Sequence, residues 1–138
     1  MNKIKAVFYA PIDCYSGYSA CSRERIKALI ELYSDKWDIK IISCGWGNTP
    51  TGFIDKHKEW EFLNNFILNE NLTYQPDLMF WFTIPIEVKP IGKYNVLWTA
   101  GIETDICAPQ WIEPINLMDL VIVPSEHSKN VFVSCLSN

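Results

Sequence analysis

The sequence predicts an α/β fold with a doubly wound parallel sheet. Short, nearly unbroken apolar runs such as Ile4–Ala10 are typical of strands that are covered on both faces. Between these runs lie amphipathic stretches such as Ser19–Tyr33, in which apolar residues recur every three or four positions. Strands that alternate with helices imply a parallel sheet with right-handed crossovers. A length of 138 residues fits a single domain, residues 1–138.

Five strands and four helices are expected in order along the chain. The expected strands are Ile4–Ala10, Trp37–Cys44, Asp77–Thr83, Tyr94–Thr99 and Asp119–Pro124. The expected helices are Ser19–Tyr33, Trp60–Ile67, Pro109–Met118 and Glu126–Cys135. On the first helix, charges at Arg23, Glu24, Lys27 and Glu31 predict the solvent face. The unbroken apolar character of Ile4–Ala10 and Leu120–Pro124 predicts that both runs are buried.

Composition argues against a nucleic-acid partner. The formal net charge is -4 and the isoelectric point is near 5.1, whereas phosphate binding needs clustered Lys and Arg. The densest basic spot, residues 56–58, is followed directly by Glu59 and Glu61, which indicates a solvated face. No apolar run approaches the ~20 residues of a transmembrane helix, so no transmembrane segment is expected.

The five cysteines predict a reduced, cytoplasmic chain. They are Cys14, Cys21, Cys44, Cys107 and Cys135. Their number is odd, they are widely spaced, and no C-x-x-C pair occurs. This pattern favours free thiols over a disulfide framework or a zinc site.

The loop after the first strand is the first candidate for ligand binding, since open α/β sheets bind ligands beyond the carboxyl ends of their strands. The loop contains only Gly17 where a dinucleotide fingerprint needs G-x-G-x-x-G, and it has no Walker A pattern. Binding of NAD is therefore not expected. A glycine before a helix can offer backbone N–H groups to a polar ligand, or it can simply close the turn. The residues leave both interpretations open.

Two further polar segments follow strands. Glu103 lies after Thr99, and a carboxylate there can act as a general base or accept hydrogen bonds from sugar hydroxyls. Alternatively, Glu103 caps the next turn. Ser125 is expected to cap the last helix, with Glu126 at its positive end.

Three segments carry a resemblance to a known family. WTAGIETD, APQWIEPINLMD and LVIVPSEHSKNVF, within Trp98–Phe132, resemble the amino-terminal domain of GT-B glycosyltransferases. The similarity is to the retaining group that includes many bacterial and phage enzymes. It implies that the chain is the Rossmann-like half of a GT-B fold. The loop Tyr15–Ser19 stands where the family keeps its acceptor loop.

Under this resemblance, roles are expected for individual residues at the ends of the strands. Glu103, in the turn where many family members have a histidine, is the expected catalytic residue, and the expected acceptor contacts are Asp13, Ser16, Gly17, Thr99 and Glu126. No metal is implied. The chain departs from the family in two places, because the turn TAGIE lacks a histidine and the first loop has one glycine where a pair is usual.

The family has two such domains, and the nucleotide-sugar donor is held mostly by the carboxyl-terminal one. This sequence ends at Asn138, so this domain is expected to bind no cofactor itself. The resemblance therefore implies a truncated or split glycosyltransferase that is inactive alone. Its partners would be a glycan or other hydroxyl acceptor and a donor-binding domain or partner chain. The rival hypothesis is a non-catalytic, Rossmann-like binding or assembly module, and the coding sequence beyond Asn138 would discriminate between the two.

Overall fold

The structure is a computed structural model that describes residues 3–45, 48–83, 88–99 and 115–122. Its elements are β1 (Ile4–Ala10), α1 (Gly17–Tyr33), β2 (Trp37–Ser43), α2 (Phe53–Lys56), the 3₁₀ helix η1 (Lys58–Asn65), β3 (Leu78–Trp81), β4 (Tyr94–Trp98) and β5 (Leu120–Ile122). Each described strand falls within a range that the apolar runs predicted. The helix α1 begins two residues earlier than its apolar periodicity indicated, because Ser16 caps it.

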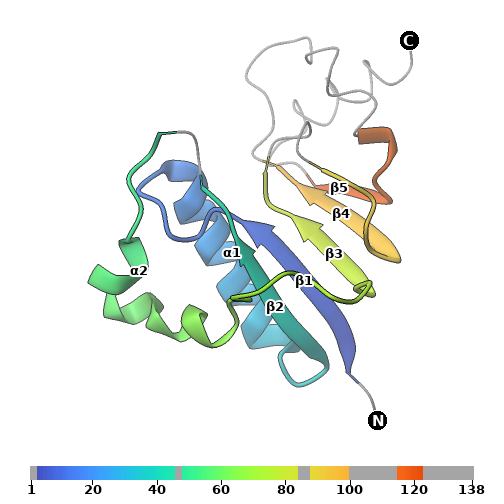
Figure 1. Cartoon of the computed structure of the whole chain (residues 1–138), viewed down its shortest axis with the longest axis horizontal. Coiled ribbons are helices and arrows are strands. Elements are labelled where there is room, and N and C mark those ends of the chain that lie inside the picture. Colours follow the sequence, from blue (N-terminus) through green and yellow to red (C-terminus); the bar gives the residue numbers. More distant parts are fainter. Residues whose placement is uncertain (1–2, 46–47, 84–87, 100–114, 123–138) are drawn as a thin grey trace.

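The five strands form one parallel sheet in the order β2-β1-β3-β4-β5 (Figure 1). The predicted α/β class with a parallel sheet of five strands is therefore confirmed. In the register, Phe8 of β1 lies between Ile41 of β2 and Phe80 of β3. Successive strands are thus aligned so that their carboxyl ends meet at one edge of the sheet, called the carboxyl edge below.

One face of the sheet packs against α1, α2 and η1. Its core combines the strand residues Ala6, Phe8, Ala10, Ile39, Ile41, Phe80, Phe82 and Val96 with the helix residues Ile26, Ile30, Ile54 and Leu63. The ring of Phe8 contacts Phe80 and Phe82 edge to face, with centroids 5.2 and 5.7 Å apart. These aromatic contacts fix β1 to β3 and so fix the loops that follow them.

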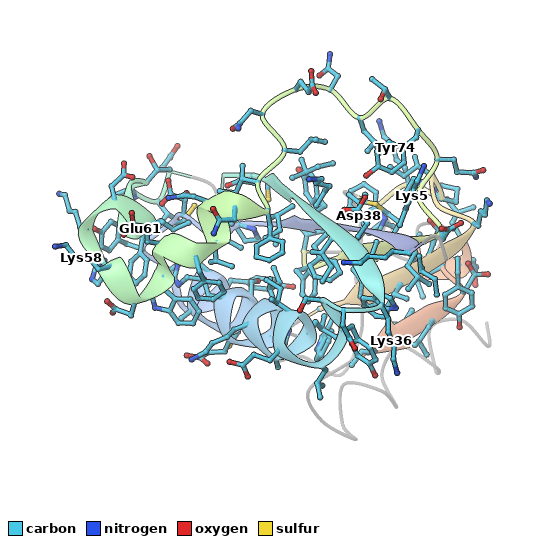
Figure 2. The ribbon with its side chains drawn as sticks, turned by 90° about the horizontal axis from the view of Figure 1, so that it is seen from below. Lys5, Lys36, Asp38, Lys58, Glu61 and Tyr74 are labelled. Carbon is cyan, nitrogen blue, oxygen red and sulfur yellow. The ribbon has the colours of Figure 1, made fainter. Side chains whose placement is uncertain are left out.

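The opposite face carries a second apolar cluster. It contains the buried residues Val7, Met79, Trp81, Val88, Leu97 and Ile115. Figure 2 shows the chain between η1 and β3 arching over this face, on the side away from α1. Leu72 and Tyr74 of this segment pack onto the cluster, and Lys5 Nζ lies 4.9 Å from the centre of the Tyr74 ring. Burial, and then the charge of Asp38, raises the pKa of the Tyr74 hydroxyl.

The second helix differs from the prediction. An α-helix was expected over Trp60–Ile67, whereas the chain forms the short helix α2 and then the 3₁₀ helix η1, which ends at Asn65. The residues that follow leave the helix because they pair with the outer edge of β2. Ile41 N donates to Phe66 O at 2.8 Å, and Leu68 N donates to Ile41 O at 2.8 Å. The edge of the sheet thus overrides the helical periodicity of Phe66 and Ile67.

The expected burial of the first and last strands is confirmed only in part. In β1 the prediction holds from Ala6 onward, whereas Ile4 at the start of the strand is 44% exposed. In β5 Leu120 is 45% exposed, and Val121 and Ile122 are half-buried. The prediction is wrong for these three residues because β5 lies at the edge of the described sheet, with β4 as its neighbour. An unbroken apolar run does not distinguish an edge strand from a central one.

Several predictions fall on residues outside the described ranges. The helix Glu126–Cys135 does, and so does most of Pro109–Met118, of which Ile115 and Asn116 are described as helical. Among the cysteines that the structure describes, Cys14 and Cys21 are free. No helix in the described ranges is long and apolar enough to cross a membrane.

Candidate functional site

The strand order places a topological switch point between β1 and β3. The chain leaves β1 toward β2 on one side and later returns to β3 on the other side. Ligands of open α/β sheets bind beyond the carboxyl ends of the strands at such a point. The loop after β1, together with the ends of β3 and β4, is therefore the candidate site.

Asp13 lies in the loop after β1, and its half-buried carboxylate accepts two backbone hydrogen bonds. Oδ1 accepts from Ile54 N at 2.8 Å, and Oδ2 accepts from Gly52 N at 3.3 Å. The carbonyl oxygen of Asp13 also accepts from Phe53 N at 3.2 Å. Asp13 thus holds the start of α2 against the loop after β1. Because a carboxylate can accept about four hydrogen bonds, it retains capacity for a ligand hydroxyl.

Ser16 and Gly17 form the start of α1. Ser16 is the N-cap, and its Oγ accepts from Ser19 N at 3.0 Å. Gly17 is exposed, a Cβ built there would meet nothing within 4 Å, and its φ is not positive. Neither packing nor backbone conformation therefore requires glycine at this position. The absence of a side chain leaves the backbone at the start of α1 open to a ligand.

Thr99 follows β4 and is 1% exposed. Its Oγ1 lies 3.2 Å from the hydroxyl of Tyr18, which makes a hydrogen bond with it. The same Tyr18 hydroxyl donates to Thr83 O at 2.9 Å. Tyr18 therefore joins the first turn of α1 to the ends of both β3 and β4. Through this contact the structure connects Thr99 to the loop that carries Ser16 and Gly17.

Arg23 of α1 holds the loop after β1 through hydrogen bonds to its backbone. The guanidinium donates to Ile12 O at 2.9 Å and to Cys14 O at 3.0 Å. The side chain is 4% exposed, so its expected place on the solvent face of α1 is wrong. Carbonyl groups of a buried loop need donors, and Arg23 supplies them. Burial lowers the pKa of the Arg23 guanidinium, while the neighbouring Cys14 and Asp13 act in the opposite direction.

A stack of three side chains connects this loop to α2. The Arg23 Cζ atom lies 3.6 Å from the centre of the Phe53 ring. The His57 ring is parallel to Phe53 within 7°, at 3.8 Å between centroids. Two groups this close to one ring centre would overlap on the same face, so Arg23 and His57 cover opposite faces of Phe53. The cation and both rings together hold α2 beside α1.

Two of the predicted site residues, Glu103 and Glu126, lie outside the described residues. The other four, Asp13, Ser16, Gly17 and Thr99, are at the carboxyl edge, as their places after strands predicted. Sequence reasoning missed Tyr18 and Arg23. A signal existed for Arg23, since it shares a helix face with Ile26 and Ile30 by its spacing.

The described groups at this edge are suited to binding hydroxyl compounds. They comprise the carboxylate of Asp13, the hydroxyl of Ser16 and the backbone at the start of α1, whereas the Thr99 hydroxyl is buried and hydrogen-bonded to Tyr18. Within the described ranges, no group of three or more His, Cys, Asp or Glu residues could hold a metal ion. The chain matches no protein-family model, no curated protein sequence and no solved structure.

Proposed function

We propose that this chain is the acceptor-binding, Rossmann-like half of a GT-B glycosyltransferase. The nucleotide-sugar donor is held by a second domain or partner chain, and sugar is transferred at the carboxyl edge. The observation that most supports the proposal is the switch point of the parallel sheet, where the loop carrying Asp13, Ser16 and Gly17 follows β1. The resemblance of Trp98–Phe132 to the family supplies the class of reaction.

The acceptor is a hydroxyl compound, and a glycan fits this edge best. A sugar hydroxyl can donate to the Asp13 carboxylate, which accepts two backbone hydrogen bonds and has capacity for more. In the proposal, Glu103 accepts the hydrogen bond or the proton of the attacking hydroxyl. A bond forms between the acceptor oxygen and the anomeric carbon, and the bond from that carbon to the diphosphate breaks.

The isolated domain is not expected to transfer sugar. Holding two reactants in near-attack geometry can lower a barrier by about 7–11 kcal/mol, and the departing diphosphate needs positive groups to stabilise it. In this proposal both contributions depend on the donor-binding half. Without them, turnover by the 138 residues alone falls below ordinary detection.

The test measures release of nucleoside diphosphate by the complete reading frame that contains these residues, co-expressed with the adjacent frame. UDP-glucose, UDP-N-acetylglucosamine and GDP-mannose serve as donors, with and without a mixture of oligosaccharide acceptors. We expect release from one donor that depends on the acceptor. We expect no release by the 138-residue chain alone under the same conditions.

Transfer by the 138-residue chain alone would refute the split site. Saccharide binding without acceptor-dependent release from any donor would refute the glycosyltransferase and favour the non-catalytic binding module.

A further inference from the structure

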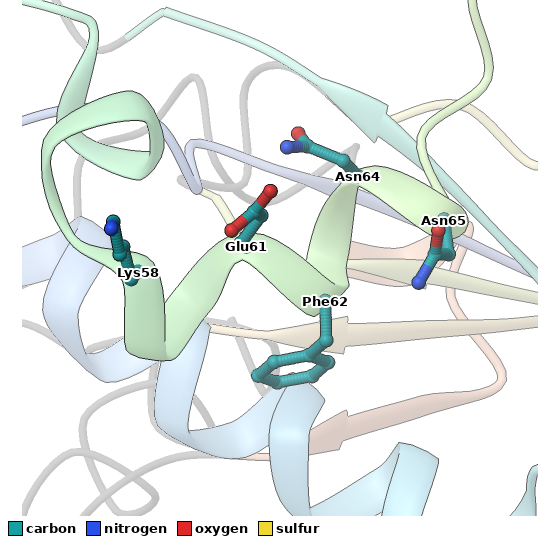
Figure 3. A pocket seen from close by; sticks show the side chains of 5 residues that line it. All are labelled: Lys58, Glu61, Phe62, Asn64 and Asn65. Carbon is teal, nitrogen blue, oxygen red and sulfur yellow. The ribbon is translucent and has the colours of Figure 1, made fainter.

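A polar hollow lies along α2 and η1. One part has a volume of about 420 Å³ and is lined by Lys58, Glu61, Phe62, Asn64 and Asn65 (Figure 3). An adjoining part of about 190 Å³ shares Lys58, Glu61 and Asn64 and adds Ile54 and Asp55. The larger part is wide open to solvent, and of its lining residues only Phe62 is half-buried, while Lys58, Glu61, Asn64 and Asn65 are exposed.

The 3₁₀ geometry of η1 aligns the polar side chains of this hollow. A 3₁₀ helix has three residues per turn, so side chains three positions apart lie above one another. Lys58, Glu61 and Asn64 are three positions apart and come from successive turns of η1. In Figure 3 the Phe62 ring points the other way, toward α1. A run of eight residues is long for this kind of helix, and an α-helix would splay the same row around its axis.

The row has unused hydrogen-bonding capacity. Among the described residues, the side chains of Asp55, Lys58, Glu61 and Asn64 make no hydrogen bond or ion pair with one another or with the rest of the chain. Lys58 and Glu61 are adjacent in the row, yet their charged atoms are more than 4.0 Å apart. A ligand between them could therefore contact both without breaking an existing ion pair.

The charges that line the hollow restrict the chemistry of that ligand. Two carboxylates, Asp55 and Glu61, face one ammonium group, Lys58, and this negative balance disfavours phosphates and other anions. The ammonium group of Lys58 beside the carboxylates disfavours a metal cation. The lining is too polar for an apolar ligand. A carboxylate only accepts, an ammonium group only donates and an amide does both, so neighbouring hydroxyl groups on a neutral ligand can satisfy all of them.

From this arrangement we infer that the hollow is a saccharide-binding subsite, separate from the carboxyl edge. One end of the hollow is close to that edge, because Ile54, which lines it, donates a backbone hydrogen bond to the Asp13 carboxylate. The other end follows η1, and the next residue, Phe66, pairs with Ile41 in the middle of β2. The inference rests on the proposed function and deepens it: the acceptor is an oligosaccharide, with one end at the carboxyl edge and a more distant unit in the hollow.

The experiment measures binding of the labelled 138-residue chain to an array of neutral oligosaccharides. The test variant carries Glu61→Ala and Asn64→Ala, and the matched control carries Glu59→Ala and Asn69→Ala, which remove the same groups outside the hollow. We expect the unchanged chain and the control to bind the same oligosaccharides. We expect the test variant to bind at least about 10-fold more weakly, because two hydrogen-bonding groups are lost. All four positions are exposed, and circular dichroism checks that each variant is folded.

Failure of this inference and failure of the proposed function give different results. If no oligosaccharide binds, if both double variants bind equally, or if the polycation spermidine binds the hollow in place of saccharides, the inference is wrong. Acceptor-dependent release by the complete enzyme would then still support the glycosyltransferase. If the array result is as expected but no donor is cleaved, the hollow is supported as a saccharide site and the transferase is refuted.

Discussion

The hydroxyl of Tyr18 connects three elements at the carboxyl edge. It reaches Thr83 O at the end of β3 and Thr99 Oγ1 at the end of β4 from the first turn of α1. Neither contact could be predicted from the chain, because a tyrosine in a first helical turn gives no indication of which strand ends it meets. In contrast, Asp13, Ser16 and Gly17 were predictable, because small and polar residues between a strand and a helix indicate a loop.

Replacing this hydroxyl tests its contribution. Tyr18→Phe should lower the free energy of unfolding by about 0.5–1.5 kcal/mol, since the ring is retained and the hydrogen bonds are lost. Tyr33→Phe is the matched control, because Tyr33 stacks on Trp37 and its hydroxyl has no partner among the described residues. Urea denaturation measures both variants, and an equal effect of the two would remove Tyr18 from this role.

Two glycines at the carboxyl edge should respond differently to alanine. Gly52 has a φ of +90°, so Gly52→Ala should destabilise the fold by about 1–2 kcal/mol. Gly17→Ala should leave the free energy of unfolding unchanged or slightly increased, because the position is helical and has free space. If Gly17 admits the acceptor, this variant should still reduce acceptor-dependent release by the complete enzyme. Full activity of Gly17→Ala would contradict a role for this position in binding.

At the scale of elements, the apolar runs located every described strand, while helix type and strand exposure were harder to predict. Periods of 3 and 3.6 residues are not separable over a segment as short as Lys58–Asn65. The end of η1 is set by pairing of Phe66–Leu68 with β2, which is a long-range contact. Exposure of Leu120 depends on which strands flank β5, and the local sequence carries no such information.

Asp77 joins the amino ends of three strands. Its Oδ2 accepts from Lys5 N of β1 at 2.9 Å, and its Oδ1 lies 3.2 Å from Lys93 Nζ, beside β4. These contacts, first the backbone hydrogen bond from Lys5 and then that from Lys93, lower the pKa of Asp77. A carboxyl group whose pKa is lower in the folded state stabilises the fold above its unfolded pKa. This stabilisation is lost as the pH falls through the folded pKa.

Asp77→Asn should therefore lower the melting temperature at pH 7, and the difference from the unchanged chain should shrink as the pH falls below about 4. Asp35→Asn serves as the control, because Asp35 is exposed and has no side-chain partner among the described residues. Thermal melts between pH 2 and pH 7 make the comparison. A difference that stays constant over this range would show that the charge of Asp77 does not contribute.

At the scale of the whole molecule, a parallel sheet with its switch point between β1 and β3 accounts for a binding edge, but the sheet alone does not specify a reaction. The reaction in this proposal comes from the resemblance of Trp98–Phe132, and Glu103 stands in the turn of that segment where the family usually has a histidine. In the proposal, described residues at the carboxyl edge contact the hydroxyl acceptor, and Tyr18 and Arg23 hold the loop after β1. The proposal also requires a donor half for transfer.

The most direct measurement of this account compares Glu103→Gln with Glu113→Gln in the complete enzyme. A carboxylate that accepts the proton or hydrogen bond of the attacking hydroxyl contributes about 10²–10⁴-fold to the rate. We therefore expect Glu103→Gln to reduce acceptor-dependent release of nucleoside diphosphate by this order, and Glu113→Gln to leave the rate close to that of the unchanged enzyme. Equal rates for the two variants would contradict the account and remove Glu103 from the site.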